Sequence, residues 1–292
     1  MNHVLTLVAD RTSTTLSPAL IEQMREALRG GPPDILSPGE AADIPLNSAP
    51  DMALVYAALG DVPVDAIAVR TRGRRKGLLI ADMDSTIVTG ETLDELADFA
   101  GLKAEIAAIT KRSMNGELDF AQALRQRVAM LKGLKLDALE KTWARVKLTP
   151  GATALVATMR AHNALTALVS GGFTFFTSRV KDLVGFDVHR SNLLIDDGEA
   201  LTGEVADPIL DRDTKLATLQ ELAAARNLKL TATLAVGDGA NDLAMLREAG
   251  LGVAFHAKPI VAKEARARID HADLRALLFA QGYRLKDIRS GD

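Results

Sequence analysis

The first 72 residues mix strand-like and helix-like patterns. Apolar residues fill positions 4–9 and alternate with polar ones over 64–70, which predicts two strands. Positions 18–28 and 52–59 carry apolar residues at helical spacing, and the break GGPP at 30–33 precedes a third strand that begins at Ile35 and Leu36. The pattern predicts a small α+β unit over residues 1–72.

A different pattern begins at residue 77. Three short apolar runs, at 77–81, 165–169 and 231–236, are each followed by polar or glycine residues and then by a helical pattern. Strands that alternate with helices are typical of a parallel sheet. We therefore expect an α/β domain over residues 77–292, with its site at the carboxyl ends of the strands.

The segment between the first two of these strands contains no buried-strand pattern. Residues 91–149 instead predict helices at 92–99, 102–112, 119–131 and 136–144. A helical insertion at this point predicts a cap over the strand ends. The basic stretch TRGRRK at 71–76 is expected to be a solvated linker.

Composition narrows the class of protein. The chain has 292 residues, is 48% hydrophobic, and balances 35 Lys and Arg against 38 Asp and Glu, which disfavours a nucleic-acid binder that relies on bulk charge. With no cysteine, a disulfide framework and a cysteine nucleophile are excluded. No apolar run approaches the length of a membrane span, and the amino terminus lacks a secretory pattern, so we expect a cytoplasmic protein.

Two acidic turns are the strongest candidates for chemistry. Asp82 and Asp84 follow the first core strand, and residues two apart on a strand point to the same side. Two close carboxylates repel one another unless a proton or a cation such as Mg²⁺ compensates. After the third strand, Asp238 could complete a metal site and Asp242 could ligate or orient through water. The alternative is that these acids only shape turns and cap helices.

Two further polar residues suit an anionic ligand. Ser170 follows the second core strand, where a hydroxyl and free N–H groups could bind phosphate oxygens. Lys215 lies in the first turn of a helix that Asp213 or Thr214 is expected to cap, and the helix dipole disfavours a cation there. An anion would explain that lysine. A plain turn and a solvated lysine are the alternatives.

The four clusters occur together in one order along the chain. DxDST at 82–86, Ser170, Lys215 and GDGAND at 237–242 resemble the haloacid dehalogenase superfamily, and within it the phosphoserine phosphatase family. The resemblance covers about residues 77–285 and includes GETLDELADFAG at 90–101 and GVAFHAKP at 252–259. It implies a Rossmann-like core with a helical cap inserted after the first core strand.

The resemblance also implies roles for these residues. Asp82 would be the nucleophile that forms an aspartyl-phosphate, and Asp84 the general acid and base. The remaining implied roles are Mg²⁺ binding by the Asp82 carboxylate, the Asp84 backbone carbonyl and Asp238, phosphoryl binding by Ser170, the Gly171 N–H and Lys215, and a substrate contact by Asn241.

Substrate identity is expected to come from the cap. Glu91 and Arg127 match the family positions that bind the ammonium and the carboxylate of phosphoserine, and Met114 and Phe120 match apolar positions near the substrate. Arg127 also lies on an otherwise apolar helical stripe, so it needs either an anionic partner or a path by which its head snorkels to water. Glu91 could instead serve the start of its helix, and Met114 and Phe120 could be ordinary core.

The sequence thus predicts a Mg²⁺-dependent phosphatase that hydrolyses phosphoserine at the end of serine biosynthesis, with no nucleic-acid or membrane partner. A phosphatase for another small phosphomonoester and a non-catalytic binding protein are the alternatives. The amino-terminal unit vaguely resembles ferredoxin-like or ACT-type modules, which often bind amino acids or mediate dimerisation. A homodimer and a purely structural extension both remain open.

Overall fold

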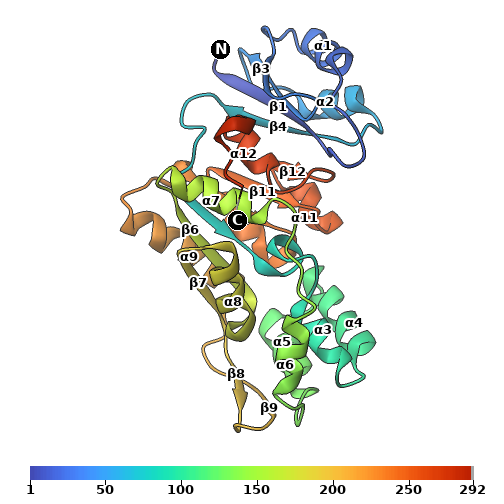
Figure 1. Ribbon diagram of the computed structural model, residues 1–292, viewed down its shortest axis with the longest axis vertical. Helices are drawn as coiled ribbons and strands as arrows, with labels where there is room; N and C mark the ends of the chain where they lie inside the picture. The colour runs from blue at the N-terminus through green and yellow to red at the C-terminus, as the bar shows by residue number, and fades with distance from the viewer. Residues whose placement is uncertain (291–292) are drawn as a thin grey trace.

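The computed structural model describes residues 1–290 and places two sheets one above the other (Figure 1). The upper sheet is antiparallel with strand order β2-β3-β1-β4. Its elements, in chain order, are β1 (His3–Ala9), α1 (Pro18–Ala27), β2 (Asp34–Ser37), β3 (Ala41–Leu46), α2 (Met52–Leu59) and β4 (Val64–Arg70). This succession and strand order are those of a ferredoxin-like unit.

The two faces of the upper sheet have different partners. Helices α1 and α2 pack on one face around Met24 and Val55. The other face lies against α12 (Ala276–Ala280) of the lower domain. The connector between the domains is exposed at Thr71, Arg72, Gly73 and Arg75, as predicted for a solvated linker. Arg74 departs from that prediction, because it donates to Asp43 in β3 and to the carbonyl oxygens of Phe279 and Ala280. These acceptors hold its guanidinium half-buried between the sheets.

The lower domain is a three-layer α/β structure with a parallel sheet, as the sequence predicts. Its strand order is β12-β11-β10-β5-β6-β7. The strands are β5 (Leu78–Ala81), β6 (Leu165–Phe173), β7 (Val188–Asn192), β10 (Thr233–Gly237), β11 (Leu251–Phe255) and β12 (Ala267–Ile269). The helices are α7 (Ala152–Ala161), α8 (Thr174–Val184), α9 (Arg212–Ala225), α10 (Leu243–Glu248) and α11 (Pro259–Glu264), with short 3₁₀ turns at Leu230–Ala232, Ala240–Asp242 and Leu285–Asp287.

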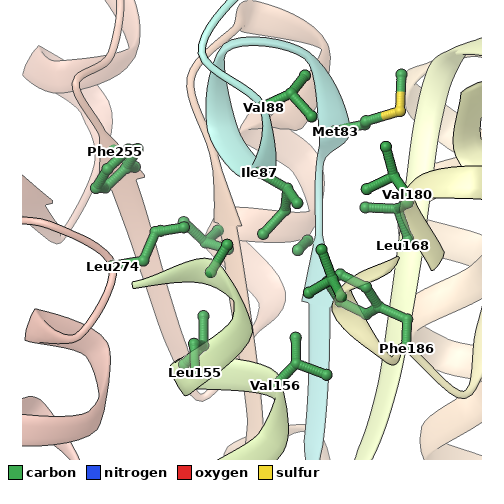
Figure 2. Close-up of a cluster of buried hydrophobic side chains, with 14 of the residues drawn as sticks. Met83, Ile87, Val88, Leu155, Val156, Leu168, Val180, Phe186, Phe255 and Leu274 are labelled. Carbon is green, nitrogen blue, oxygen red and sulfur yellow. The ribbon is translucent and has the colours of Figure 1, made fainter. Parts of the chain in front are cut away.

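Alternation along the strands divides the core between the two faces of this sheet. Figure 2 shows one side, where Leu168 of β6 meets Leu155 and Val156 of α7 and Val180 of α8. Ala167 and Val169, the neighbours of Leu168 along β6, point the opposite way and pack in the core beside α9 and α10. The sheet is therefore buried on both faces, and only the ends of its strands are open for a site.

The helical cap lies beyond the carboxyl ends of the strands (Figure 1). It consists of α3 (Thr92–Asp98), α4 (Lys103–Met114), α5 (Phe120–Ala129) and α6 (Asp137–Trp143). Each end lies within two residues of the predicted helix. A hairpin that the sequence analysis did not predict, β8 (Leu194–Asp196) and β9 (Leu201–Val205), packs against α5. No helix among residues 1–290 has the length and apolarity needed to cross a bilayer.

Candidate active site

The predicted polar turns meet because their strands are neighbours. Strand β5 lies between β10 and β6, so Asp82, Ser170 and Asp238 extend from three adjacent strand ends. All three side chains are buried. The structure therefore confirms that the strand ends gather these groups in one place.

Asp84 reaches the site by a different route from the one predicted. Strand β5 ends at Ala81, and residues Met83–Ile87 form an irregular turn in which Asp84 has a ψ of 136° and Ser85 a φ of 56°. Asp84 Oδ1 accepts a hydrogen bond from the Thr92 N–H (2.8 Å), and Ser170 Oγ donates to Asp84 Oδ2 at 3.4 Å. Burial raises the pKa of this carboxyl, which favours the protonated form that an acid catalyst needs.

Lys215 is buried, with 2% of its surface exposed, so the solvated alternative is wrong. The helix α9 begins one turn before Lys215. Its N-cap is Asp211, whose carboxylate accepts a hydrogen bond from the Thr214 N–H. The residues predicted to cap it, Asp213 and Thr214, are instead the second and third residues of the helix. Lys215 Nζ lies 2.7 Å from Asp82 Oδ1 and 2.6 Å from Asp242 Oδ1.

The charges in this cluster do not balance. Burial by itself would lower the pKa of Lys215, but Asp242 and Asp82 outweigh it and raise that pKa, so the ammonium stays charged. Burial and the nearby Asp242 raise the pKa of Asp82. Three buried carboxylates face one buried ammonium here, so a proton or a cation must supply the missing positive charge.

The carboxylates fit a divalent cation. One oxygen from each of Asp82, Asp238 and Asp242 lies within 4.8 Å of the others. Asp242 is already engaged, because Lys215 donates to Oδ1 and the N–H groups of Asp238 and Gly239 donate to Oδ2. Asp238 has no hydrogen-bond partner among the described residues at either oxygen. Hard oxygen donors of this kind suit Mg²⁺, and Asp82 and Asp238 are the two carboxylates that hold no backbone N–H group as Asp242 does.

Lys258 is a charged neighbour of this cluster that the sequence analysis did not single out. Its Nζ lies 3.3 Å from Asp238 Oδ2. Burial, followed by repulsion from Asp242, still raises the pKa of Asp238 to about 6, since Lys258 only partly opposes both effects. The lysine stands in the GVAFHAKP segment, but only the folded structure places it beside the acid.

Most of the predicted substrate-binding residues surround one narrow cavity, with a volume of about 30 Å³. From the core and the turn after β5 it is lined by Asp82, Asp84, Glu91, Ser170, Gly171 and Asn241, and from the cap by Met114, Phe120 and Arg127, among others. A side chain at Gly171 would collide with the Phe120 ring, since its Cβ would lie 2.4 Å from Phe120 Cζ. The glycine thus lets the cap approach the loop after β6.

Arg127 does not snorkel to water, because only 6% of its surface is exposed. Its Nη1 donates to Thr110 Oγ1 (2.9 Å), and Thr110 in turn donates to Asp94 Oδ1 (2.7 Å). Thr110 and Asp94 come from α4 and α3, and the sequence analysis missed both. Nothing in their own helical patterns distinguishes them from other polar residues, and only packing of the three helices brings them to Arg127.

Glu91 lies near the acids, at the start of α3. It is half-buried, and Ser85 Oγ donates to Glu91 Oε1 (2.6 Å). Burial and the negative charges of Asp84 and Asp238 raise the pKa of Glu91 to about 8. A carboxyl in such surroundings gains from a ligand that brings its own positive charge.

Comparison with known proteins identifies the family. A family model described as haloacid dehalogenase-like hydrolase matches residues 79–247, which is more than half of the chain. The chain belongs to the haloacid dehalogenase-like hydrolases. The matched range takes in β5, the cap and the Gly-Asp-Gly turn after β10, so this hydrolase has its family's core around the cavity described above.

Relatives of this hydrolase include proteins with a named activity. A phosphoserine phosphatase from Streptococcus thermophilus is 47% identical over 200 residues, which cover 68% of this chain and 93% of the relative. One from Streptomyces coelicolor is 41% identical over 250 residues, 85% of this chain, but the match spans only 60% of the relative's length. A solved phospho-aspartyl intermediate analogue of phosphoserine phosphatase is 41% identical, covers 70% of this chain and 98% of its own, and has a TM-score of 0.67.

Proposed function

We propose that this hydrolase is a Mg²⁺-dependent phosphoserine phosphatase that converts O-phospho-L-serine to L-serine and phosphate. One observation carries the proposal: a single cavity is lined by phosphoryl-transfer groups and also by the half-buried Glu91 and the buried Arg127. The named activity of the relatives supports the same substrate. Formation of L-serine makes this the last step of serine biosynthesis.

Asp82 is the nucleophile in this proposal. A carboxylate oxygen of Asp82 attacks phosphorus, and the bond between phosphorus and the serine oxygen breaks as Asp84 donates its proton to that oxygen. Asp84 then takes a proton from water, the water oxygen attacks phosphorus, and the bond to Asp82 breaks. The intermediate analogue among the solved relatives supports a phosphorylated aspartate.

The other core residues neutralise and orient the phosphoryl group. Lys215 is held against Asp82 at 2.7 Å and would meet the phosphoryl oxygens beside it. Ser170 and the Gly171 N–H would donate to the same oxygens, and Asn241, whose Oδ1 has no partner among the described residues, would contact bound substrate. Mg²⁺, held by Asp82, Asp238 and the Asp84 backbone carbonyl, would neutralise phosphoryl charge.

Recognition of the amino-acid end would come from opposite charges. Arg127 offers a planar pair of donors to a carboxylate, while Glu91 offers an acceptor to an ammonium. Met114 and Phe120 line the cavity between them and exclude water. The homodimer and the amino-acid-binding role of residues 1–72 stay predictions, as do the boundaries of the domains.

A panel of substrates tests the proposal. We expect phosphate release from O-phospho-L-serine to exceed that from phosphoethanolamine, which lacks the carboxylate, and from 3-phosphoglycerate, which lacks the ammonium, each assayed with Mg²⁺ and with a chelator. Equal release from all three would remove the substrate assignment and leave the reaction class. Release that persists in the chelator after dialysis would contradict the metal site.

A further inference from the structure

Asn192 lies outside the cavity but joins two parts of the site. It is the last residue of β7, the edge strand next to β6, and only 2% of its surface is exposed. Its Nδ2 donates to the carbonyl oxygen of Gly171 (2.8 Å), and its Oδ1 accepts from the N–H of Leu210 (2.7 Å). Because a carbonyl only accepts and an N–H only donates, these two partners fix the orientation of the amide.

The first contact reaches Ser170 through one peptide plane. The Gly171 carbonyl and the Gly172 N–H belong to the same rigid peptide unit, so a bond that holds the carbonyl also aims the N–H. That N–H donates to Ser170 Oγ (2.9 Å). With its oxygen engaged as an acceptor there, the Ser170 hydroxyl directs its proton toward the cavity, where Asp84 Oδ2 lies 3.4 Å away.

The second contact reaches the helix that carries Lys215. Leu210 directly precedes Asp211, the N-cap of α9. Lys215 lies one turn further on, and its backbone N–H donates to the Asp211 carbonyl. The amide of Asn192 therefore spans from the irregular carboxyl end of β6 to the start of α9. These are the two segments whose side chains and N–H groups face the phosphoryl site.

We propose that Asn192 is a positioning residue that sets the loop at Ser170–Gly172 and the first turn of α9 at a fixed separation. It touches no substrate and acts through Ser170 and Lys215. The inference rests on the proposed phosphoryl-transfer function. Loss of a link of this kind misplaces the groups on either side of the phosphoryl oxygens, and a misplacement near 1 Å costs about 10²-fold in rate.

Asn192→Leu and Asn192→Asp test the proposal in different ways. Leucine has a similar size and removes both hydrogen bonds, so we expect kcat to fall about 10- to 100-fold at every pH. We expect the fall to be equal for phosphoserine and para-nitrophenyl phosphate, because the phosphoryl end is common to both.

The aspartate variant provides a conservative rescue. A protonated carboxyl has the shape of an amide, donates one hydrogen bond and accepts another, whereas an ionised carboxylate only accepts. Ionisation would place a negative oxygen against the Gly171 carbonyl. The ratio of kcat in Asn192→Asp to kcat in wild type should therefore approach one at low pH and fall at least tenfold as the pH rises, with folding followed by circular dichroism.

Thr166→Val is a matched control on the same two-strand unit. Thr166 lies at the opposite end of β6, and its Oγ1 donates to Asp187 Oδ2 (2.9 Å) and accepts from the Asp187 N–H (3.2 Å), so valine also removes two buried hydrogen bonds. We expect this variant to lower the melting temperature without changing kcat.

Three outcomes would overturn the positioning role. These are wild-type kcat in Asn192→Leu, an equal loss of kcat in Thr166→Val, or a ratio for Asn192→Asp that does not change with pH. If Asn192→Leu does not fold, the aspartate series alone decides. Failure of the proposed phosphoryl-transfer function is separate, because wild type itself would then release no phosphate from either ester.

Discussion

At the scale of single residues, the site holds more negative charge than the protein alone can neutralise. Asp82 and Asp242 share the ammonium of Lys215, and Asp238 has only the partly exposed Lys258 nearby. Glu91 has no cationic partner that donates to it among the described residues. Buried charge of this kind is costly unless a ligand completes it. The missing charges are those that a divalent cation and the ammonium group of an amino acid would bring.

The role of Arg127 can be separated from the chemistry. Replacing Arg127 with alanine removes a charge-assisted contact to the substrate carboxylate. We expect this to cost about 2–5 kcal/mol of transition-state stabilisation for phosphoserine, which lowers kcat/KM more than tenfold. The value for para-nitrophenyl phosphate, which lacks that carboxylate, should change little. Thr110→Val, which removes the hydroxyl that Arg127 donates to, should give a smaller loss in the same direction.

The comparison of the two substrates decides between binding and support. If Arg127 only stabilises the cap, both kcat/KM values fall together and their ratio stays at its wild-type value. That result would remove Arg127 from the substrate site and weaken the choice of phosphoserine.

Glu91 predicts a pH dependence. Its raised pKa of about 8 means that the carboxyl is protonated below that pH and then cannot pair with an ammonium. The kcat/KM for phosphoserine, relative to para-nitrophenyl phosphate, should therefore fall as the pH falls, by about tenfold per unit below the midpoint. A metal cation bound at Asp82 and Asp238 would offset part of the negative charge near Glu91. The midpoint of this pH dependence in the metal-bound enzyme therefore lies below about 8.

Glu91→Gln supplies the control for that titration. The variant should bind phosphoserine poorly at every pH, and its substrate ratio should no longer change with pH. A slope that survives in Glu91→Gln would assign the titration to another group.

Sequence reasoning reached the residues whose own position was unusual. Lys215 was predicted at the end of a helix where the dipole disfavours a cation, and Arg127 on an otherwise apolar stripe. In the structure both are buried, Lys215 against Asp242 and Arg127 against Thr110. Thr110, Asp94 and Asn192 carry no such local conflict. Their roles depend on contacts between helices or strands that are distant in sequence, which a pattern along one element does not contain.

At the scale of elements, the cap is held from two sides. Residues 87–89 pair with 147–149 at its base, and the β8–β9 hairpin contacts α5 at its outer side (Figure 1). Within the hairpin, Gly203 has a φ of +84°, and a Cβ there would lie 2.9 Å from Lys132 Cβ and 3.3 Å from the Ala129 carbonyl oxygen. The glycine therefore allows the hairpin to approach the end of the helix that carries Arg127.

Gly203→Ala tests this support. The left-handed backbone costs alanine about 1–2 kcal/mol of folding free energy, and the contact with α5 adds to it. We expect a lower melting temperature and a higher KM for phosphoserine. Gly198→Ala in the same hairpin has a φ of +91° but open space around its Cβ, so it should show the stability loss without the change in KM. Equal KM values in the two variants would contradict the account.

The helices of the cap were predictable because each has apolar residues at helical spacing. The hairpin was not, since β8 spans only Leu194–Asp196 and β9 contains Gly203 and Glu204. The same holds for β7, whose sequence VHRSN has almost no apolar alternation. Edge strands and short hairpins gain their stability from neighbours, so their own sequence says little.

At the scale of the whole molecule, buried charged contacts fasten the upper sheet to the lower domain. Arg74 Nη1 lies 2.5 Å from Asp43 Oδ2, and Asp65 accepts from the N–H groups of Asp270, His271 and Ala272. Arg275 pairs with Glu40 across the same interface. We therefore expect the chain to unfold in one cooperative transition, and two separate calorimetric transitions would contradict this.

Arg74→Met measures the strength of this interface. Because it leaves Asp43 with its charge largely buried and its cation removed, we expect a loss of about 3–5 kcal/mol in the free energy of unfolding by urea. Arg25→Met breaks an exposed ion pair with Glu22 and should cost less than about 1 kcal/mol. Similar losses in both variants would show that Arg74 contributes no more than a surface contact.

The overall layout was predictable in part. The change of pattern at residue 77 separates the two sheets, but the docking between them was not visible, because TRGRRK has the composition of a solvated linker. Two of the acceptors that hold Arg74, the carbonyl oxygens of Phe279 and Ala280, lie more than 200 positions away in the sequence.

The central claim is that phosphate passes through Asp82. The most direct measurement is an acid quench during turnover of ³²P-labelled phosphoserine, followed by proteolysis and identification of the labelled peptide. We predict label on the peptide that contains Asp82, and neither label nor turnover in Asp82→Asn, which keeps the size of the side chain and removes the attacking charge. Label on another residue, or steady turnover with Asp82→Asn, would contradict the account.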